Sequence, residues 1–233
     1  ANFPGQVSWF ADPDLLQAAS AMAQGYLVQE NGSPVVGDQS VAISKWVTSL
    51  RSALDESAAA SGVESQLRVL PYADIDATAT RRTDLATELI RAVTQAPIIS
   101  RAAIGTPVAG TTYWAPGGRI DEDTAELLAS AGATTVALSA RAVTTSGNAP
   151  AIASLSTPAG TITALLIDPK LANLLTTPKT SANDVILARQ RFLAETALLA
   201  TSSTGAAHVI AAPLDVRWAP NSQLLSDLLS ATT

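Results

Sequence analysis

Four aspartates stand where a predicted β-strand ends, and carboxylates in such places could do acid–base chemistry. They are Asp12, Asp74, Asp168 and Asp215. Two carboxylates about 5–10 Å apart across a cleft are the machinery of a glycoside hydrolase. Each aspartate also has a structural explanation. Asp12 and Asp168 precede a proline and a predicted helix, as N-caps do, Asp74 suits a turn, and Asp215 could pair with Arg217.

Aromatic residues close to arginines mark a second kind of candidate site. Trp114 lies five residues before Arg119, and Trp218 directly follows Arg217. A tryptophan beside a guanidinium suits stacking on a sugar ring or gripping an acidic group. The alternative is that both tryptophans fill the mouth of an incomplete barrel. The predicted ligand-binding residues are Tyr72, Asp74, Trp114, Arg119, Arg217 and Trp218.

The residue types of the chain exclude several other chemistries. The sequence contains no cysteine, which removes thiol catalysis, disulfides and cysteine-ligated metals. Its one histidine, His208, begins the last predicted strand, away from the strand ends, so we expect a structural role. A single imidazole also leaves little basis for a serine triad. Gly117-Gly118 lacks the Lys and Ser/Thr of a phosphate loop and is interpreted as a turn with positive φ. We predict no metal and no cofactor.

Five apolar stretches, each followed by a helix-like segment, must position these residues. They are Val7–Asp12, Leu67–Asp74, Thr111–Gly118, Thr163–Asp168 and Val209–Asp215. A repeated strand–helix unit predicts parallel strands whose carboxyl ends share one face, where such folds keep their sites. We therefore expect Asp12, Asp74, Trp114, Asp168 and Asp215 to converge.

The strand count and the first turn favour a barrel over an open sheet. Thr134–Leu138 adds a further strand, and Ala151–Ser156 with Thr161–Ile167 predicts an inserted β-hairpin. A doubly wound sheet would carry a glycine-rich phosphate turn after an early strand, but Asp12-Pro13 stands there. The predicted fold is an incomplete (β/α) barrel of about six or seven mainly parallel strands.

Four local predictions concern the helices and loops between the strands. Glu30–Gln39 is interpreted as a loop, and Trp46 is placed on the apolar stripe of a long helix. Pro97 is expected to end the helix that contains it. Asp123 and Glu126 are interpreted as a capping box.

Length and charge limit the class of protein. The 233 residues, 47% of them apolar, fit a single globular domain, 1–233. The 14 Lys and Arg against 20 Asp and Glu give a net charge of −6, which repels phosphate backbones and predicts no nucleic-acid partner. No apolar run approaches the ~20 residues that a membrane span needs. The abrupt start suggests a domain excised from a longer protein.

Several segments together resemble one family. They are Val7–Leu16, Gln66–Asp74, Tyr113–Leu138, Arg189–Leu199 and Val209–Asn221. They are similar to an uncharacterised actinobacterial cell-envelope family, a domain of unknown function whose members are secreted or membrane-anchored and often encoded beside a lipid II flippase. This resemblance implies an extracytoplasmic location in the cell envelope, with the anchor outside this chain.

The segment from Trp114 to Leu138 is also similar to glycoside hydrolase and polysaccharide deacetylase barrels. Such deacetylases hold a metal with an Asp and two His, which one histidine cannot supply. This similarity implies an incomplete barrel with an ancestral connection to carbohydrates. Together with the strand ends and the missing metal ligands, the resemblances predict a non-catalytic, carbohydrate-binding pseudoenzyme. It would bind an envelope glycan or a partner protein, such as the flippase machinery, at the strand ends. The enzyme alternative is a metal-independent glycoside hydrolase that uses two of Asp12, Asp74, Asp168 and Asp215.

Overall fold

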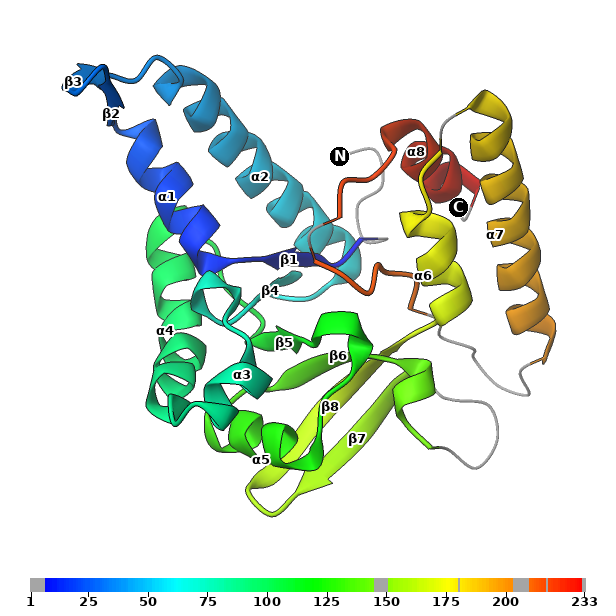
Figure 1. The fold of residues 1–233 in the computed structure, drawn as a ribbon. Helices are drawn as coiled ribbons and strands as arrows, with labels where there is room; N and C mark the ends of the chain where they lie inside the picture. The colour runs from blue at the N-terminus through cyan, green and yellow to red at the C-terminus, as the bar shows by residue number, and fades with distance from the viewer. Residues whose placement is uncertain (1–6, 145–150, 180, 203–209, 217, 232–233) are drawn as a thin grey trace. The chain divides into compact units, whose positions relative to one another are not determined.

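The computed structural model describes residues 7–144, 151–179, 181–202, 210–216 and 218–231. The chain divides into two compact units. Unit 1 comprises Ala1–Thr112 with Ala131–Ala133, and unit 2 comprises Tyr113–Ser130 with Thr134–Thr233. Each unit combines helices with small sheets (Figure 1). The mixed α/β class is therefore confirmed, whereas the prediction of one domain stays a prediction.

Unit 1 is built around a pair of parallel strands. Strand β1 (Trp9–Ala11) pairs in parallel with β4 (Leu67–Val69), and Val69 makes a further parallel bridge to Thr111. The helices of this unit are α1 (Pro13–Ala23), α2 (Ser40–Ser61), α3 (Ala77–Arg82) and α4 (Ala86–Ile104), with a 3-10 turn, η1, at Tyr72–Asp74. The core between these helices and the strands includes Leu16, Leu54, Leu67, Val69 and Ile104. The predicted parallel arrangement is confirmed for β1 and β4.

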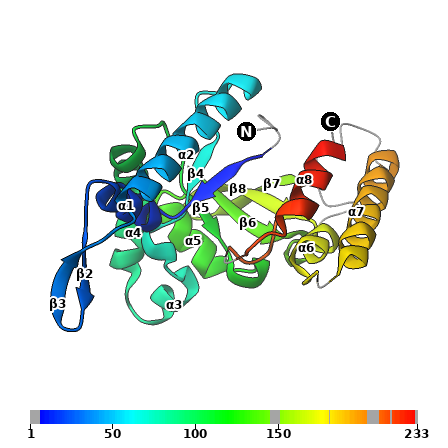
Figure 2. The ribbon, with the colours of Figure 1, turned by 90° about the horizontal axis from the view of Figure 1, so that it is seen from above.

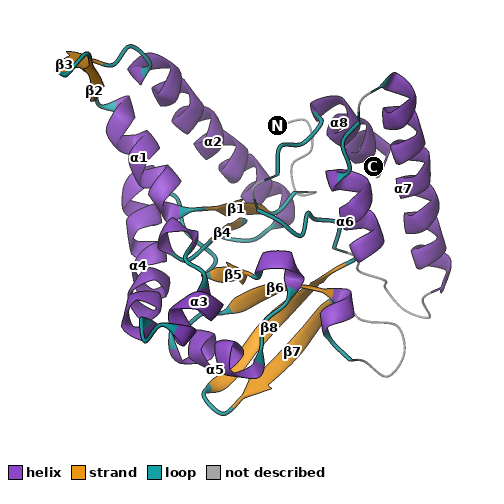
Figure 3. Cartoon of the chain, in the orientation of Figure 1, coloured by secondary structure: helices purple, strands orange, loops and turns teal. Residues whose placement is uncertain are grey.

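A hairpin stands where the sequence predicted a loop. Strands β2 (Leu27–Glu30) and β3 (Ser33–Val36) pair antiparallel and extend beyond the ends of α1 and α2 (Figure 3). Asn31 and Gly32 connect them with φ values of 50° and 82°. Two central residues with positive φ, Asn then Gly, form the type I′ turn that favours hairpins. The prediction of a loop at Glu30–Gln39 is therefore wrong. The Asn31-Gly32 pair was the sequence signal for the hairpin.

Proline does not end the fourth helix. Pro97 lies inside α4, so the predicted helix end is wrong. Proline has no N–H to donate to the carbonyl four residues earlier, which is that of Val93. The hydroxyl of Thr111 lies 3.3 Å from the Val93 carbonyl oxygen and donates to it. A side chain thus replaces the lost backbone hydrogen bond and lets the helix continue.

Trp46 is not a core residue. Its side chain is 45% exposed, whereas the neighbouring Val47 is 5% exposed. The buried residues of α2 are Val47, Leu54 and Ser57, which lie on one face at helical spacing. One position along a helix turns a side chain by about 100°, so Trp46 falls off that face.

Unit 2 contains a four-stranded mixed sheet in the order β5-β6-β8-β7. Its strands are β5 (Thr112–Trp114), β6 (Thr135–Ser139), β7 (Ile152–Thr157) and β8 (Gly160–Ile167). The division between the two units falls within β5. Strands β6 and β8 are parallel, and β7 and β8 form an antiparallel hairpin. The predicted hairpin is confirmed. Of the last predicted strand, Ile210 bridges Ile167, and His208 lies outside the described residues.

Four helices belong to unit 2. They are α5 (Glu122–Ser130), α6 (Pro169–Thr176), α7 (Ala182–Ser202) and α8 (Ser222–Ala231). Helices α6, α7 and α8 lie next to one another (Figure 2) and share an apolar cluster. The cap of α5 is Asp121, whose carboxylate accepts from the Thr124 N–H at 2.8 Å. The capping box predicted for Asp123 and Glu126 is therefore wrong, because the N-cap lies two residues before Asp123.

Of the barrel prediction, only the α/β class is confirmed. The described strands form a parallel pair, a hairpin and a four-stranded mixed sheet. These small sheets are compatible with a (β/α) arrangement, but a barrel of six or seven strands stays a prediction.

Candidate functional site

The candidate site is a cavity of about 780 Å³ within unit 2. Helices α6 and α7 line it, together with Arg141 from the short turn η3 (Ala140–Ala142) and Leu214 and Asp215 from the segment after Ile210. The polar side chains of its wall are Arg141, Lys170, Asn173, Thr176, Arg191, Glu195 and Asp215. The apolar ones are Pro169, Ala172, Leu174, Ala194 and Leu214. The wall therefore combines seven polar with five apolar side chains and can offer a ligand both hydrogen bonds and apolar contacts.

The carboxyl ends of two parallel strands place this cavity. Strand β6 runs into η3, where the Ser139 hydroxyl accepts from the Arg141 N–H at 3.3 Å. Strand β8 runs into α6, where Asp168 accepts from the N–H groups of Lys170 and Leu171 at 2.8 and 2.9 Å. The Asp168 N–H donates to the Ile210 carbonyl at 3.1 Å, which brings the last segment alongside. A cavity thus lies at the ends of β6 and β8 in unit 2, and a functional site there stays a prediction.

A glycine holds the turn after β5 against the same strand ends. Gly118 has a φ of 70°, and a Cβ built on it would lie 2.6 Å from the Ser139 nitrogen and 3.1 Å from Leu214. Only glycine allows so close an approach at a positive φ. The interpretation of Gly117-Gly118 as a turn with positive φ is confirmed.

One ion pair crosses the cavity wall. Lys170 Nζ on α6 lies 3.1 Å from Glu195 Oε2 on α7, with the two side chains 60% and 30% exposed. Such a solvent-exposed pair adds little stability, but it fixes both side chains. Arg141 and Arg191 form no ion pair with any residue in the described part of the chain. The wall therefore carries three cationic and two anionic side chains, with two guanidinium groups uncompensated by a bonded carboxylate.

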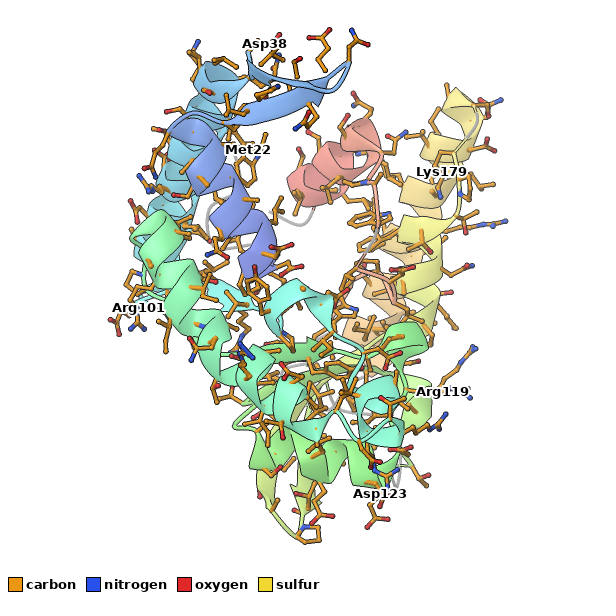
Figure 4. All side chains as sticks on the ribbon, turned by 60° about the vertical axis from the view of Figure 1, so that its left-hand side comes forward. Met22, Asp38, Arg101, Arg119, Asp123 and Lys179 are labelled. Carbon is orange, nitrogen blue, oxygen red and sulfur yellow. The ribbon has the colours of Figure 1, made fainter. Side chains whose placement is uncertain are left out.

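The site residues predicted in unit 2 lie in different environments. Asp215 lines the cavity. Asp168 is the N-cap of α6, which was the structural role considered for it. Trp114 is 8% exposed, so it has little surface for a ligand, and its burial favours the core-filling alternative. Trp218 is half-buried against the cluster of α6, α7 and α8. Arg119 is exposed and points outward (Figure 4), and it is not part of the cavity wall.

Arg217 lies outside the described residues, so its predicted pairing with Asp215 stays a prediction.

The strand ends of unit 1 bring together the other predicted residues. Asp12 Oδ1 accepts from the N–H groups of Asp14 and Ala73 at 2.9 and 3.0 Å. It therefore caps α1 and ties the end of β1 to the turn after β4. The Tyr72 hydroxyl donates to Asp14 Oδ1 at 2.9 Å. Ala73 and Asp74 both have positive φ, 58° and 47°, so this turn is strained for residues with a Cβ.

Two groups at this turn have raised pKa values. Burial raises the pKa of the Asp12 carboxyl because it penalises the charged form, and the hydrogen bonds from the Asp14 and Ala73 N–H groups offset part of the rise. The hydrogen bond to Asp14 raises the pKa of the Tyr72 phenol, since ionisation would remove the donated proton. Both effects follow from contacts that hold the turn together.

The strand-end aspartates are divided between the two units, and the catalytic pair expected among them stays a prediction. Asp12 and Asp74 belong to unit 1, while Asp168 and Asp215 belong to unit 2. Asp12 and Asp168 act as N-caps. Among the residues that the structure describes, no three His, Asp or Glu side chains are grouped so as to hold a metal ion. In the same part of the chain no helix has both the length and the apolar composition for a membrane crossing.

Sequence reasoning missed most of the cavity wall. Arg141, Lys170, Asn173, Arg191 and Glu195 were not singled out, because none stands at the last residue of a strand. A signal did exist. Arg141 and Lys170 follow the ends of β6 and β8 by two and three residues, where a site at strand ends draws its side chains.

Comparisons with known proteins add a distant similarity. No family model matches the chain, and no curated protein matches it. The chain is similar to the crystal structure of a protein from Mycobacterium smegmatis assigned as a polysaccharide deacetylase, at 15% sequence identity and a TM-score of 0.37. The similarity covers 78% of this chain and 57% of that one, so this chain spans little more than half of its length. At this TM-score the similarity carries no argument about activity.

Proposed function

We propose that this chain is a non-catalytic binding domain of an actinobacterial cell-envelope protein, and that it takes an envelope glycan in the cavity of unit 2. The resemblance of segments such as Val7–Leu16 and Val209–Asn221 to an extracytoplasmic envelope family supports the location. The cavity supports the binding role, and it is the observation on which the proposal depends.

The size and lining of the cavity suit a short glycan. Its volume of about 780 Å³ lies within the ~300–1,000 Å³ of typical small-molecule sites. Guanidinium, ammonium, amide and hydroxyl groups on its wall can donate to sugar hydroxyls and carbonyls. Leu174 and Leu214 offer apolar surface for the faces of the rings. The protein would thus recognise the ligand by hydrogen bonds at the ends of β6 and β8.

The arrangement favours binding over hydrolysis. The carboxylates on the cavity wall are those of Glu195 and Asp215, and Glu195 is engaged by Lys170. A glycoside hydrolase needs two carboxylates that act directly on the scissile bond. A deacetylase that holds its metal with two histidines needs more than the single histidine of this sequence.

A cavity-filling variant tests this function. Ala194 on α7 is exposed and lines the cavity, whereas Ala197 on the same helix is exposed and does not. Titration calorimetry with purified disaccharide fragments of peptidoglycan should show binding to the wild type and to Ala197→Trp. Ala194→Trp should lose it, because the indole occupies the ligand volume. Mass spectrometry should find the fragments unchanged.

Undiminished binding by Ala194→Trp would move the site elsewhere. Cleaved or deacetylated fragments would support an enzyme, and a wild type that binds no fragment would refute the glycan-binding function.

A further inference from the structure

We infer that the ligand of the unit 2 cavity carries an anionic group, a carboxylate or a phosphate, which Arg141 and Arg191 bind together. This inference rests on the proposed function and names the chemical class of its glycan. It depends on where the two guanidinium groups lie and on what occupies the neighbouring carboxylates.

The two arginines reach one cavity from different elements. Arg141 belongs to η3, directly after β6, and the Ser139 hydroxyl holds its backbone N–H at 3.3 Å. Arg191 belongs to α7, and both side chains line the cavity and are exposed. Groups held by separate elements can approach a ligand from two sides, which fixes its orientation.

The ion pair of the wall separates Glu195 from Arg191. Arg191 stands four residues before Glu195, a spacing at which helical residues of opposite charge pair. Glu195 is instead bonded to Lys170 of α6 at 3.1 Å. In the described part of the chain neither Arg141 nor Arg191 has an ion pair. Asp215, the other carboxylate of the wall, is itself engaged in an interaction.

The charge of this wall also runs against that of the protein. The whole chain has a net charge of −6, whereas the cavity wall carries more cationic than anionic side chains. A guanidinium presents a planar fork of donors that matches a carboxylate or a phosphate with two parallel hydrogen bonds. Two such forks on one wall suit an anion better than a neutral sugar hydroxyl.

Matched ligands test the inference separately from the proposed function. The probes are N-acetylmuramic acid, its uncharged methyl ester, and N-acetylglucosamine 1-phosphate. We expect the wild-type protein to bind at least one anionic probe about tenfold more tightly than the ester. A factor of about ten in affinity corresponds to the free energy of one charge-assisted hydrogen bond. The preference should weaken as salt is added. The acid and the phosphate arms show which anion the cavity prefers.

Variants then assign the preference to residues. Arg141→Gln and Arg191→Gln should each remove the preference for the anionic probe while binding of the ester stays. Arg189→Gln is the matched control, because Arg189 is exposed on α7 and does not line the cavity. Circular dichroism melting curves of the three variants check folding, and the comparison of acid and ester in the wild type needs no variant.

Equal affinity of the wild type for all three probes would overturn the inference and leave glycan binding intact. A preference that survives both substitutions would overturn the assignment to these arginines. Failure of every probe to bind would overturn the proposed function with it.

Discussion

Gly118 holds the turn after β5 close to the end of β6. Its φ is 70°, and an added Cβ would lie 2.6 Å from the Ser139 nitrogen. We expect Gly118→Ala to lower the free energy of unfolding by about 2–4 kcal/mol, because both the backbone and the packing must shift. Gly117 has a φ of 63° but open space around it. Gly117→Ala should therefore cost only about 1 kcal/mol.

Urea denaturation of both glycine variants measures the difference. Equal losses would show that the close approach to Ser139 contributes nothing beyond the positive φ.

Asp12 accepts two structural hydrogen bonds, while its burial disfavours the charged form of its carboxyl group. Asp12→Ala removes the acceptor of the Asp14 and Ala73 N–H groups and should cost about 1–2 kcal/mol of stability. Asp12→Asn keeps an acceptor oxygen, so it should cost less. The two variants separate the hydrogen bonds from the charge, and chemical denaturation at pH 7 compares them.

The raised pKa of Asp12 also predicts a pH dependence. Because the folded pKa lies above the unfolded one, the contribution of Asp12 is fully present below the unfolded pKa and is lost as the pH rises through the folded pKa. The wild type should therefore lose stability relative to Asp12→Asn as the pH rises from about 3 through the ordinary aspartate pKa of 3.8 and the raised pKa above it. Denaturation curves of both proteins across this range measure the difference. A relative gain by the wild type would contradict the cause assigned to the shift.

The continuity of helix α4 depends on one hydroxyl group, that of Thr111. Thr111 donates to the Val93 carbonyl that Pro97 leaves without a backbone partner. Thr111→Val should cost about 1–3 kcal/mol, because a buried carbonyl loses its hydrogen bond. In a Pro97→Ala background the alanine N–H can bond Val93, so the same substitution should cost less.

A double-mutant cycle on thermal or urea unfolding tests this coupling between Thr111 and Pro97. Additive losses would show that the hydroxyl does not compensate for the proline.

The predictability of each element followed the range of the interactions that form it. The hairpin of β7 and β8 was predictable because its strands and turn are contiguous, and the caps by Asp12 and Asp168 were predictable because a cap is local. The continuation of α4 was not, since the compensating Thr111 lies fourteen residues after Pro97. Trp46 failed because helical spacing alone did not tell which face of α2 packs.

At the scale of the whole molecule, the sequence predicted one convergence of five residues, and the structure describes two units. Within unit 1, Asp12 and the turn at Tyr72–Asp74 come together as parallel strand ends should. Within unit 2, Asp215 reaches a cavity at the ends of β6 and β8. Arg141 and Lys170 of the cavity wall follow strand ends and so had a sequence signal. The residues that α7 contributes had none, because no local pattern encodes how two helices pack against each other.

The strand ends of the two units can be distinguished by where a ligand binds. The cavity belongs to unit 2 alone, whereas the turn at Tyr72–Asp74 owes its strain and hydrogen bonds to contacts within unit 1. Titration of ¹⁵N-labelled protein with N-acetylmuramic acid should therefore shift most strongly the amide signals of Lys170, Asn173 and Arg191. Largest shifts at Tyr72 and Ala73 would instead place the ligand on unit 1. The strained turn would then be the binding element, since left-handed backbone at a strand end is kept where function requires it.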